Sequence, residues 1–406
     1  MFHITLYTFF LIFLSTCQNE KTDLLSSSEV KVINNSGVLK IVPGAERLPQ
    51  YYDLIKNKRV GLVVNQTSIV RGVHLVDSLI KAGIDIQLVF APEHGFRGDA
   101  DAGEKIKDEK DSKTGISIVS LYGNKKKPSV KELENIDLIL FDIQDVGVRF
   151  YTYISTLHYV MEACAENDKP LVVLDRPNPN AHYIDGPVLK KEFSSFIGLH
   201  PVPVVYGMTI GEYAKMINGE KWLSNGVQCE LTVIENKNYS HDSFYELPVR
   251  PSPNLPNARS VLLYPSLCFF EGTEVSVGRG TETQFQVFGH PSITSSYFFV
   301  PMPNHGAKSP LHQGEKCYGT DLTTKTIEEL LNEKKLNLSY LIEMYSKINK
   351  TGKPFFLENL FFDKLAGTDS LRKMLMVKTT EKEIRASWKN ELENFKKLRL
   401  KYLLYE

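Results

Sequence analysis

The sequence lacks several features that mark large classes of protein. Outside a short N-terminal stretch it has no apolar run of about 18 residues or more, which excludes a multi-span membrane protein. It has no excess of either charge, because 48 Lys and Arg residues balance 48 Asp and Glu residues. This balance argues against a protein that binds nucleic acid, or a membrane through a basic patch. With 42% hydrophobic and 24% charged residues, the composition is that of a soluble globular chain.

Motifs that hold cofactors or build common catalytic centres are also missing. There is no GxGxxG or GxxxxGK[ST] phosphate loop, so we expect no nucleotide cofactor, and indeed no cofactor of any kind. There is no GxSxG nucleophile elbow for a serine hydrolase, and no HxH or HExxH metal motif. Four cysteines, Cys164, Cys229, Cys268 and Cys317, lack CxxC spacing, which leaves either disulfides or buried free thiols.

The N-terminus has the pattern of an export signal. Residues 1–17 carry an apolar run from Ile4 to Leu14 and end in Leu-Ser-Thr-Cys, which is similar to a bacterial lipobox. We therefore expect lipidation at Cys17 and a protein held by that anchor at the periplasmic face of a bacterial membrane. An ordinary cleaved signal and an uncleaved anchor are the alternatives. Residues 18–37 are polar and suit a tether to the folded body.

Residues 38–245 show short apolar runs that alternate with segments of helical periodicity. The runs, expected as strands, are Val60–Val64, Ile86–Phe90, Ile116–Leu121, Asp137–Phe141 and Leu171–Leu174, and helices are expected near Leu75–Ala82 and after Tyr151. Apolar strands separated by helices are typical of a parallel sheet covered on both faces. The fold class is therefore α/β, with a Rossmann-like, doubly wound, mostly parallel sheet.

A second, smaller domain of mixed α+β structure is expected over residues 246–406. The segment Pro251–Pro256 has three prolines in six positions and cannot be a helix or a central strand, which suggests a boundary nearby. At the end of the chain, Ile384, Trp388, Leu392, Phe395 and Leu398 recur at steps of three or four. This pattern predicts a C-terminal helix from Glu381 that docks by its apolar face.

Polar residues follow three of the expected strands, and topology brings the carboxyl ends of parallel strands to one edge of a sheet. The first loop contains Glu93, His94 and Arg97; the second contains Asp142, Gln144, Asp145 and Arg149; the third contains Asp175, Arg176 and Asn178. Carboxylates beside guanidinium groups suit acid/base chemistry on a polar or anionic substrate. The alternative is that these Asp and Arg residues pair with one another and tie the loops together. His94 beside Glu93 also allows a metal site, although we expect none.

A second surface is the glycine-rich stretch from Phe270 to Thr281, with Glu271, Glu274 and Arg279. These side chains are expected either to close over the first domain's edge or to sit in an ordinary hairpin. Tyr151, before the long helix, is expected to stack on a sugar ring or to pack on the sheet.

Eight ordered motifs spread over the chain resemble one family. They are NQTS at 65–68, APEHGFRG at 91–98, FDIQDVGVRFYTY at 141–153, LDRPNP at 174–179, DGPVL at 185–189, PSPNLP at 251–256, GTEVSVGRGT at 272–281 and YLLY at 402–405. Together they resemble the NamZ-like exo-β-N-acetylmuramidases. The resemblance implies a Rossmann-like domain, an auxiliary domain, and an active site in the cleft between them, with Glu93 as the leading catalytic carboxylate.

The implied activity is hydrolysis that releases N-acetylmuramic acid from the non-reducing end of peptidoglycan fragments. Such hydrolysis needs a general acid, and either a nucleophile, a base, or help from the substrate's acetamido group. Asp142, Asp145 and Asp175 are candidates for the second role, whereas Arg149, Arg176 and Arg279 are candidates to bind the lactyl carboxylate. A non-catalytic periplasmic binder of muropeptides or sugars and a metal-dependent hydrolase remain the alternatives.

Overall fold

The structure, a computed structural model, describes residues 39–96 and 109–406. The expected signal segment with Cys17, the tether 18–37 and Arg97 lie outside these residues. A central sheet has the strand order β5-β6-β4-β1-β7-β8-β9, and every neighbouring pair is parallel except β5 and β6. Its strands are β1 (Arg59–Val64), β4 (Asp85–Ala91), β5 (Glu109–Lys110), β6 (Ser117–Ser120), β7 (Leu138–Asp142), β8 (Leu171–Leu174) and β9 (Leu231–Ile234).

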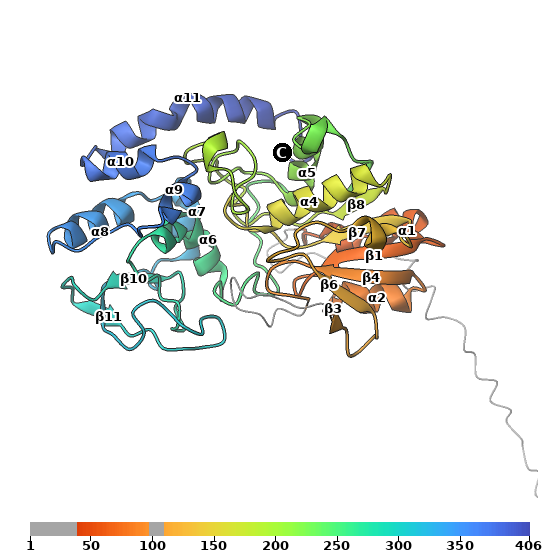
Figure 1. The fold of residues 1–406 in the computed structure, drawn as a ribbon, viewed down its shortest axis with the longest axis horizontal. Helices are drawn as coiled ribbons and strands as arrows, with labels where there is room; N and C mark the ends of the chain where they lie inside the picture. The colour runs from red at the N-terminus through yellow and green to blue at the C-terminus, as the bar shows by residue number, and fades with distance from the viewer. Residues whose placement is uncertain (1–38, 97–108) are drawn as a thin grey trace, which may run out of the picture.

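Both faces of this sheet are buried, as its near-continuous apolar strands require. Alternate residues of β8 show this, because Leu171 and Val173 belong to one hydrophobic cluster and Val172 and Leu174 to another. The first cluster lies under α4 (Tyr153–Glu166) and α5 (Ile210–Gly219), and the second under α1 (Leu48–Ile55) and α2 (Leu75–Lys81) (Figure 1). The predicted α/β fold class is thereby confirmed.

The second lobe is built on a small antiparallel sheet in the order β10-β12-β11. Its strands are β10 (Val287–His290), β11 (Tyr297–Phe299) and β12 (Cys317–Asp321). Its helices are α6 (Ala258–Leu267), α7 (Ile327–Glu333), α8 (Ser339–Asn349), α9 (Phe361–Ala366), α10 (Ser370–Met376) and α11 (Glu381–Arg399). The remaining elements are β2 (Ile69–Val70), β3 (Val73–His74), α3 (Val130–Leu133), and four 3-10 turns: η1 (Gly44–Glu46), η2 (Lys191–Phe193), η3 (Ser224–Gly226) and η4 (Cys268–Gly272).

The two lobes share one hydrophobic core. The cluster under α4 and α5 continues into the second lobe, where it includes Leu263, Phe269 and Phe288. Because one continuous hydrophobic cluster contains residues of both lobes, groups from both lobes are held in a fixed relation to each other. A site between the lobes is therefore preorganised by packing.

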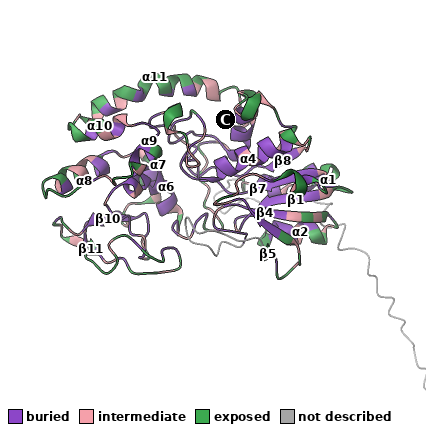
Figure 2. Cartoon of the chain, viewed as in Figure 1, coloured by how far each residue is buried: buried purple, intermediate pink, exposed green. Residues whose placement is uncertain are grey.

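The C-terminal helix α11 runs along the top of the second lobe and ends near α5 of the Rossmann-like domain (Figure 1). It begins with a capping box between Thr380 and Glu383, and it buries Ile384, Trp388, Leu392 and Phe395, as the periodicity predicted. Its outward face is exposed (Figure 2). Beyond it the chain returns to the Rossmann-like domain, where the Tyr405 hydroxyl donates to Asp175 at 2.6 Å.

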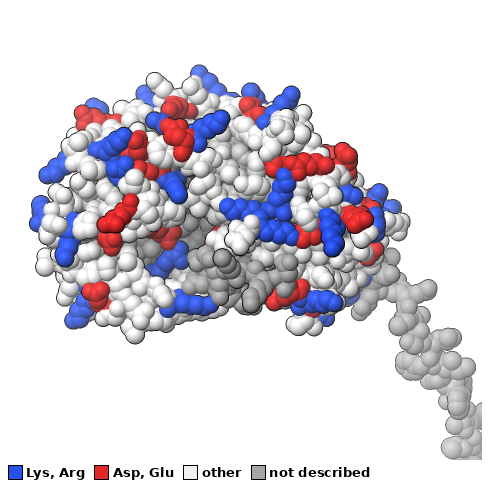
Figure 3. Space-filling model, in the orientation of Figure 1, with Lys and Arg blue, Asp and Glu red and all other residues white. Residues whose placement is uncertain are grey.

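The four described cysteines are free and buried, so among residues 39–96 and 109–406 the thiol alternative holds. No helix in that part of the chain is long and apolar enough to cross a membrane. Figure 3 shows Lys and Arg side chains interspersed with Asp and Glu over one face of the molecule, so the overall charge balance also holds locally there.

Candidate active site

A pocket of about 190 Å³ lies between the two lobes. The Rossmann-like domain contributes the loop after β4, Tyr122 after β6, residues 150–152 before α4, and the pair Phe196 and Ile197. The second lobe contributes Ser252, Asn254, Leu255, Tyr264, Cys268, Glu271, Arg279, Phe285, Phe361 and Leu365. Among the predicted site residues, the pocket brings together Glu93, His94, Tyr151, Glu271 and Arg279.

Glu93 reaches the pocket from a tight turn at the end of β4. The amide of Gly95 donates to the carbonyl of Pro92 at 3.1 Å, and His94 between them has a φ of +70°. A positive φ at the third turn position is typical of a type II turn, which usually places glycine or asparagine there. A histidine in this conformation is strained, and such strain is retained where the surroundings hold it. The turn aims the Glu93 side chain at the pocket wall.

Two hydroxyl-bearing neighbours surround the Glu93 carboxylate. Thr152 Oγ1 donates to Glu93 Oε2 at 2.7 Å. Burial, together with the nearby charge of Glu93, raises the pKa of the Tyr122 phenol. Tyr122 therefore stays protonated at neutral pH and can donate to the carboxylate. Glu93 is thus a partly buried carboxylate beside two hydroxyl groups at the edge of a cavity.

On the opposite wall, Arg279 and Glu271 form an ion pair. Arg279 Nε and Nη2 lie 2.7 and 2.5 Å from Glu271 Oε1, and the guanidinium lies 5.4 Å from the ring centre of Phe285. Burial opposes the charge of Arg279, but the Glu271 carboxylate outweighs it and raises the pKa of the guanidinium. The guanidinium therefore stays charged, although the pair as a whole is neutral.

The glycines on either side of Arg279 explain how its loop fits. Gly278 and Gly280 have φ values of +77° and +80°, which favour glycine. A Cβ on Gly278 would lie 2.6 Å from Val287 Cγ2, and one on Gly280 would lie 2.6 Å from the Met302 carbonyl oxygen. The Gly-Arg-Gly motif thus has a structural reason, and it is not a phosphate loop.

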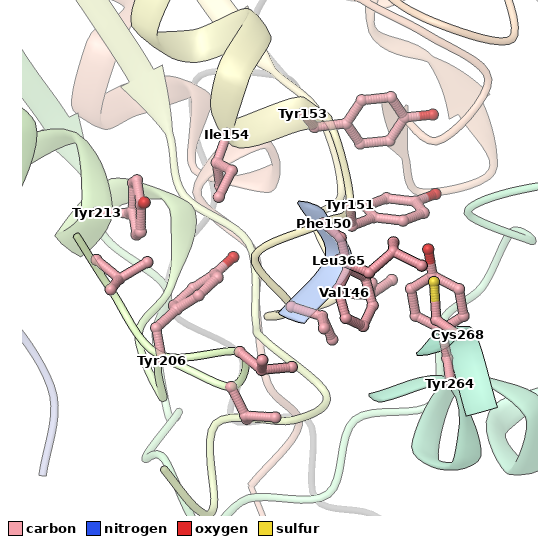
Figure 4. Close-up of a cluster of buried hydrophobic side chains, with 14 of the residues drawn as sticks. Val146, Phe150, Tyr151, Tyr153, Ile154, Tyr206, Tyr213, Tyr264, Cys268 and Leu365 are labelled. Atoms are coloured by element: carbon pink, nitrogen blue, oxygen red, sulfur yellow. The ribbon is translucent and has the colours of Figure 1, made fainter. Parts of the chain in front are cut away.

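The aromatic residues Phe150, Tyr151 and Tyr264 also line the pocket, and Figure 4 shows them close together in the hydrophobic cluster. Tyr264 packs edge-on against Phe150 and Tyr151, with ring centres 5.5 and 5.9 Å apart. The Tyr151 hydroxyl donates to the Pro251 carbonyl at 2.6 Å. Tyr151 thus both lines the pocket and fastens the proline-rich segment to the Rossmann-like domain.

Asp142 and Arg176 lie elsewhere, in a buried ion pair. Arg176 Nε and Nη2 donate to the two Asp142 carboxylate oxygens at 2.5 and 2.8 Å, and Asp142 is 0% exposed. The pair ties the ends of β7 and β8 together. Neither residue lines the pocket, so the geometry differs from the expected catalytic and lactyl-binding roles and matches the loop-tying alternative.

Asp175 is also buried away from the pocket. Its carboxylate accepts hydrogen bonds from the Tyr405 hydroxyl, Thr209 Oγ1 and the Gly211 amide at 2.6 to 2.8 Å. Burial raises the pKa of Asp175 to about 7, although these donors oppose the shift. The raised pKa of Asp175 comes from its burial in the fold, and Asp175 does not line the pocket.

The other loop residues have structural partners too. Arg149 is 0% exposed and donates to the carbonyls of Pro187, Val202 and Leu365, and burial lowers its pKa to about 9. Asp145 accepts hydrogen bonds from the Tyr206 hydroxyl and the Gly147 amide, and burial raises its pKa to about 6.

Gln144 donates to the carbonyls of Asp145 and Pro177, and Asn178 donates to the carbonyl of Met208. In the second lobe, the Glu274 amide donates to the Phe355 carbonyl. These five residues do not line the pocket.

The pocket also contains polar residues that the sequence did not single out. Tyr122 follows β6, so the strand-end argument that found Glu93 applies to it equally. Ser252 and Asn254 belong to the PSPNLP motif, which was interpreted as a domain boundary. Thr152 lies in the FDIQDVGVRFYTY motif, but nothing in the sequence assigned a role to it. Within residues 39–96 and 109–406, no group of three or more His, Cys, Asp or Glu side chains is arranged to hold a metal ion.

Comparisons with known proteins cover nearly the whole described chain. Residues 60–259 match the family described as exo-beta-N-acetylmuramidase NamZ, N-terminal, and residues 262–405 match its C-terminal counterpart. The chain is 39% identical over 377 residues to the peptidoglycan beta-N-acetylmuramidase NamZ of Bacillus subtilis (strain 168), which covers 88% of this chain and 89% of the relative.

Two crystal structures of DUF1343 family proteins from Bacteroides fragilis NCTC 9343 have a similar fold. One is 45% identical with a TM-score of 0.84, the other is 27% identical with a TM-score of 0.75, and each match covers 90% of this chain and 99% of that one. The sequence matches span both lobes, including the two walls of the pocket. The chain therefore belongs to the exo-β-N-acetylmuramidase NamZ family.

Proposed function

We propose that this protein is an exo-acting glycoside hydrolase that releases N-acetylmuramic acid from the non-reducing end of peptidoglycan fragments. Family membership and the 39% identity to the Bacillus subtilis muramidase support this activity. In the cell, this hydrolysis serves the turnover or recycling of the cell wall. The observation that carries the proposal is the position of Glu93, a partly buried carboxylate that faces a cavity between two lobes.

Glu93 serves as the general acid. It protonates the glycosidic oxygen as that oxygen's bond to the anomeric carbon breaks, and water supplies the hydroxyl group that ends on the anomeric carbon. The proton transfer lowers the barrier to loss of the leaving sugar. Thr152 and Tyr122 hold the carboxyl group at the wall, which preserves its orientation through the reaction.

Arg279 binds the lactyl carboxylate that distinguishes N-acetylmuramic acid from N-acetylglucosamine. Its Nε and Nη2 are directed to Glu271, and among the described residues Nη1 has no hydrogen-bond partner. A guanidinium anchored on one edge by Glu271 presents its other edge in a fixed direction, which suits a carboxylate ligand. Glu271 is thus a positioning residue for Arg279.

The proposal also includes the location of the protein. It is exported, lipidated at Cys17 and attached to the periplasmic face of a bacterial membrane. The lipobox-like sequence supports the export and the lipidation. In cells grown with labelled palmitate, the wild-type protein should incorporate label, and a Cys17→Ala protein should not. Labelling of both proteins, or of neither, contradicts this part of the proposal.

The activity is tested with a chromogenic N-acetylmuramide, the matching N-acetylglucosaminide, and a chelator control. The purified protein should release the chromophore from the muramide alone, and the chelator should not change the rate. Equal release from both sugars contradicts the role of Arg279. Binding of the muramide without release favours a non-catalytic binder, and loss of activity with chelator favours a metalloenzyme.

A further inference from the structure

Among the described residues that line the pocket, Glu93 and Glu271 are the two that carry a carboxylate. The activity proposed above uses Glu93 as the acid and gives Glu271 only the role of holding Arg279. Glycoside hydrolysis also needs a second group besides the acid. The aspartates expected to supply it are buried away from the pocket; they are Asp142, Asp145 and Asp175. Glu271 is therefore the pocket carboxylate that remains available for this role.

A closely packed turn presents Glu271 to the pocket. The residue belongs to η4 and follows Phe270, which is 0% exposed. On its other side, a Cβ on Gly272 would lie 2.4 Å from the backbone nitrogen of Phe362, so the turn packs directly on α9. Between these two buried residues, the Glu271 side chain is 22% exposed and lines the pocket. A ligand in the pocket can therefore reach it.

The two carboxylate oxygens of Glu271 have different partners. Oε1 accepts hydrogen bonds from Arg279 Nε at 2.7 Å and Nη2 at 2.5 Å. Among the described residues, the donor to Oε2 is the Cys268 thiol, at 3.5 Å. A thiol is a weak donor, and each carboxylate oxygen has two lone pairs. Oε2 can therefore accept a hydrogen bond from a ligand.

The ion pair with Arg279 favours one of the roles that a second carboxylate can have. A glutamate is ionised at neutral pH, and a guanidinium bonded to it stabilises that charge. A general base must take up a proton, and the ion pair opposes this. An acceptor for a substrate N–H needs only to keep its charge. Glu271 is therefore better suited to accept a hydrogen bond than to act as a base.

The substituents of the proposed substrate match this ion pair. N-acetylmuramic acid carries its lactyl carboxylate and its acetamido group on adjacent ring carbons. If Arg279 binds the lactyl carboxylate, then Glu271, which is in direct contact with Arg279, lies beside the neighbouring substituent. The cation thus meets an acceptor of hydrogen bonds, and the carboxylate meets the acetamido N–H, which is a donor.

We propose that Glu271 is the second catalytic residue. Its Oε2 accepts a hydrogen bond from the N–H of the 2-acetamido group and so orients the acetamide carbonyl oxygen to attack the anomeric carbon. The proposal rests on the proposed function, because it takes N-acetylmuramic acid as the substrate. As the carbonyl oxygen bonds to the anomeric carbon, the bond to the glycosidic oxygen breaks, and that oxygen takes the proton of Glu93. The Glu271 carboxylate stabilises the positive charge of the resulting cyclic oxazolinium ion.

Water completes the reaction. A water molecule gives one proton to Glu93, which thereby regains its acidic form. The water oxygen bonds to the anomeric carbon as the bond from that carbon to the acetamide oxygen breaks. Two displacements at one carbon retain its configuration, so the product is released as the β-anomer.

The first experiment uses the wild-type protein and follows hydrolysis of the chromogenic N-acetylmuramide by NMR. The first-formed sugar should be the β-anomer. The thiazoline analogue of N-acetylmuramic acid, a stable mimic of the cyclic ion, should inhibit with a Ki about 100-fold or more below KM. A first-formed α-anomer, which indicates direct attack by water, would overturn the proposal, and so would a lack of inhibition by the thiazoline.

The second experiment isolates the role of Glu271. Two chromogenic 3-O-lactyl sugars are compared, one with the 2-acetamido group and one with a 2-hydroxyl group in its place. The wild-type protein and a Glu271→Gln variant are assayed on both, and kcat and KM are measured separately. Both substrates carry the lactyl group, so a disturbance of Arg279 affects both and cancels in the ratio of their rates.

Glu271→Gln should lower the preference for the acetamide by about 100-fold, mainly through kcat. The glutamine oxygen would bond to Arg279, which leaves its NH2 group facing the acetamido N–H, a donor against a donor. The matched control is Glu274→Gln, on the same glycine-rich stretch, because Glu274 does not line the pocket. This control should leave the preference unchanged.

An equal loss on both substrates, with the preference unchanged, would mean that Glu271 acts only through Arg279 and would overturn the proposal. If Glu271→Gln does not fold, the NMR and inhibition measurements on the wild-type protein decide the question. A failure of the wild-type protein to hydrolyse the acetamido substrate at all would instead overturn the proposed function, and this inference with it.

Discussion

The loop after β4 and the loops after β7 and β8 occupy equivalent places at the carboxyl edge of one sheet, yet their carboxylates have different surroundings. Glu93 after β4 faces the pocket and is held by a threonine hydroxyl. Asp142 at the end of β7 is fully buried against Arg176. Asp175 after β8 is fully buried against Tyr405. Equivalent topology therefore places candidates at one edge, and the cover over each loop decides which of them meets a substrate.

The largest difference between these carboxylates is expected when the acidic proton of Glu93 is removed by substitution. Glu93→Gln keeps the shape and the hydrogen bond from Thr152 but cannot donate a proton to the leaving oxygen. We expect kcat on the muramide to fall by about three orders of magnitude, with little change in the free energy of unfolding. The exposed Glu134→Gln variant is the matched control and should keep full activity. Full turnover by the Glu93→Gln protein would refute the assignment.

At the buried ion pair of Asp142 and Arg176, we expect a substitution to lower stability much more than activity. Arg176→Met leaves the Asp142 carboxylate buried without its cation, which should lower the free energy of unfolding by about 3–5 kcal/mol in urea denaturation. Activity per folded molecule should change far less than stability. Arg59→Met removes a partly exposed pair with Asp137 and should barely alter stability. Arg176→Met with normal stability but no activity would place Arg176 in the catalytic machinery.

The two kinds of carboxylate should also differ in how pH affects stability. Burial raises the pKa of Asp175 to about 7, above its ordinary value of 3.8, so the folded state keeps a proton that the unfolded chain loses. The contribution of Asp175 to the free energy of unfolding therefore falls as pH rises from about 4 to about 7, and it is constant above that range.

Buried histidines such as His200, whose pKa burial lowers, act in the opposite direction over part of this range. The measurement is therefore the difference between the wild-type protein and Asp175→Asn in urea denaturation from pH 4 to 8. The stability of the wild-type protein relative to the variant should decline from pH 4 to about 7 and then stay constant up to pH 8. Parallel curves would contradict the assigned pKa.

The smallest expected effect is at the neighbour of Glu93. Thr152→Val removes the hydroxyl that donates to the carboxylate, while it keeps a similar volume. We expect kcat to fall by about three- to tenfold, with KM nearly unchanged, because the acid is less well oriented. Thr152→Ser restores the hydroxyl and should recover most of the rate. No recovery would show that the threonine methyl group, and not the hydrogen bond, is what matters.

Much of the fold could be predicted because its signals are local. Strands such as Val60–Val64 and Leu171–Leu174 are short apolar runs, and the helical period of Ile384, Trp388, Leu392 and Phe395 marks the docking face of α11. The strand-end rule found Glu93, and the motif resemblance selected it as the leading catalytic group. The same rule also proposed Asp142, Asp145 and Asp175, since it contains no information about burial.

Local sequence patterns set the alternation of strands and helices, the polar loops at the strand ends, and the motifs that mark the family. Which of those loops line the pocket depends on the tertiary fold. The reason is that burial depends on contacts between residues far apart in the chain. Asp175 is covered by Tyr405, 230 positions later, and Arg149 donates to Leu365, 216 positions later. Asn254 is likewise fixed by a contact that no local pattern predicts, because its Nδ2 donates to the Gly306 carbonyl.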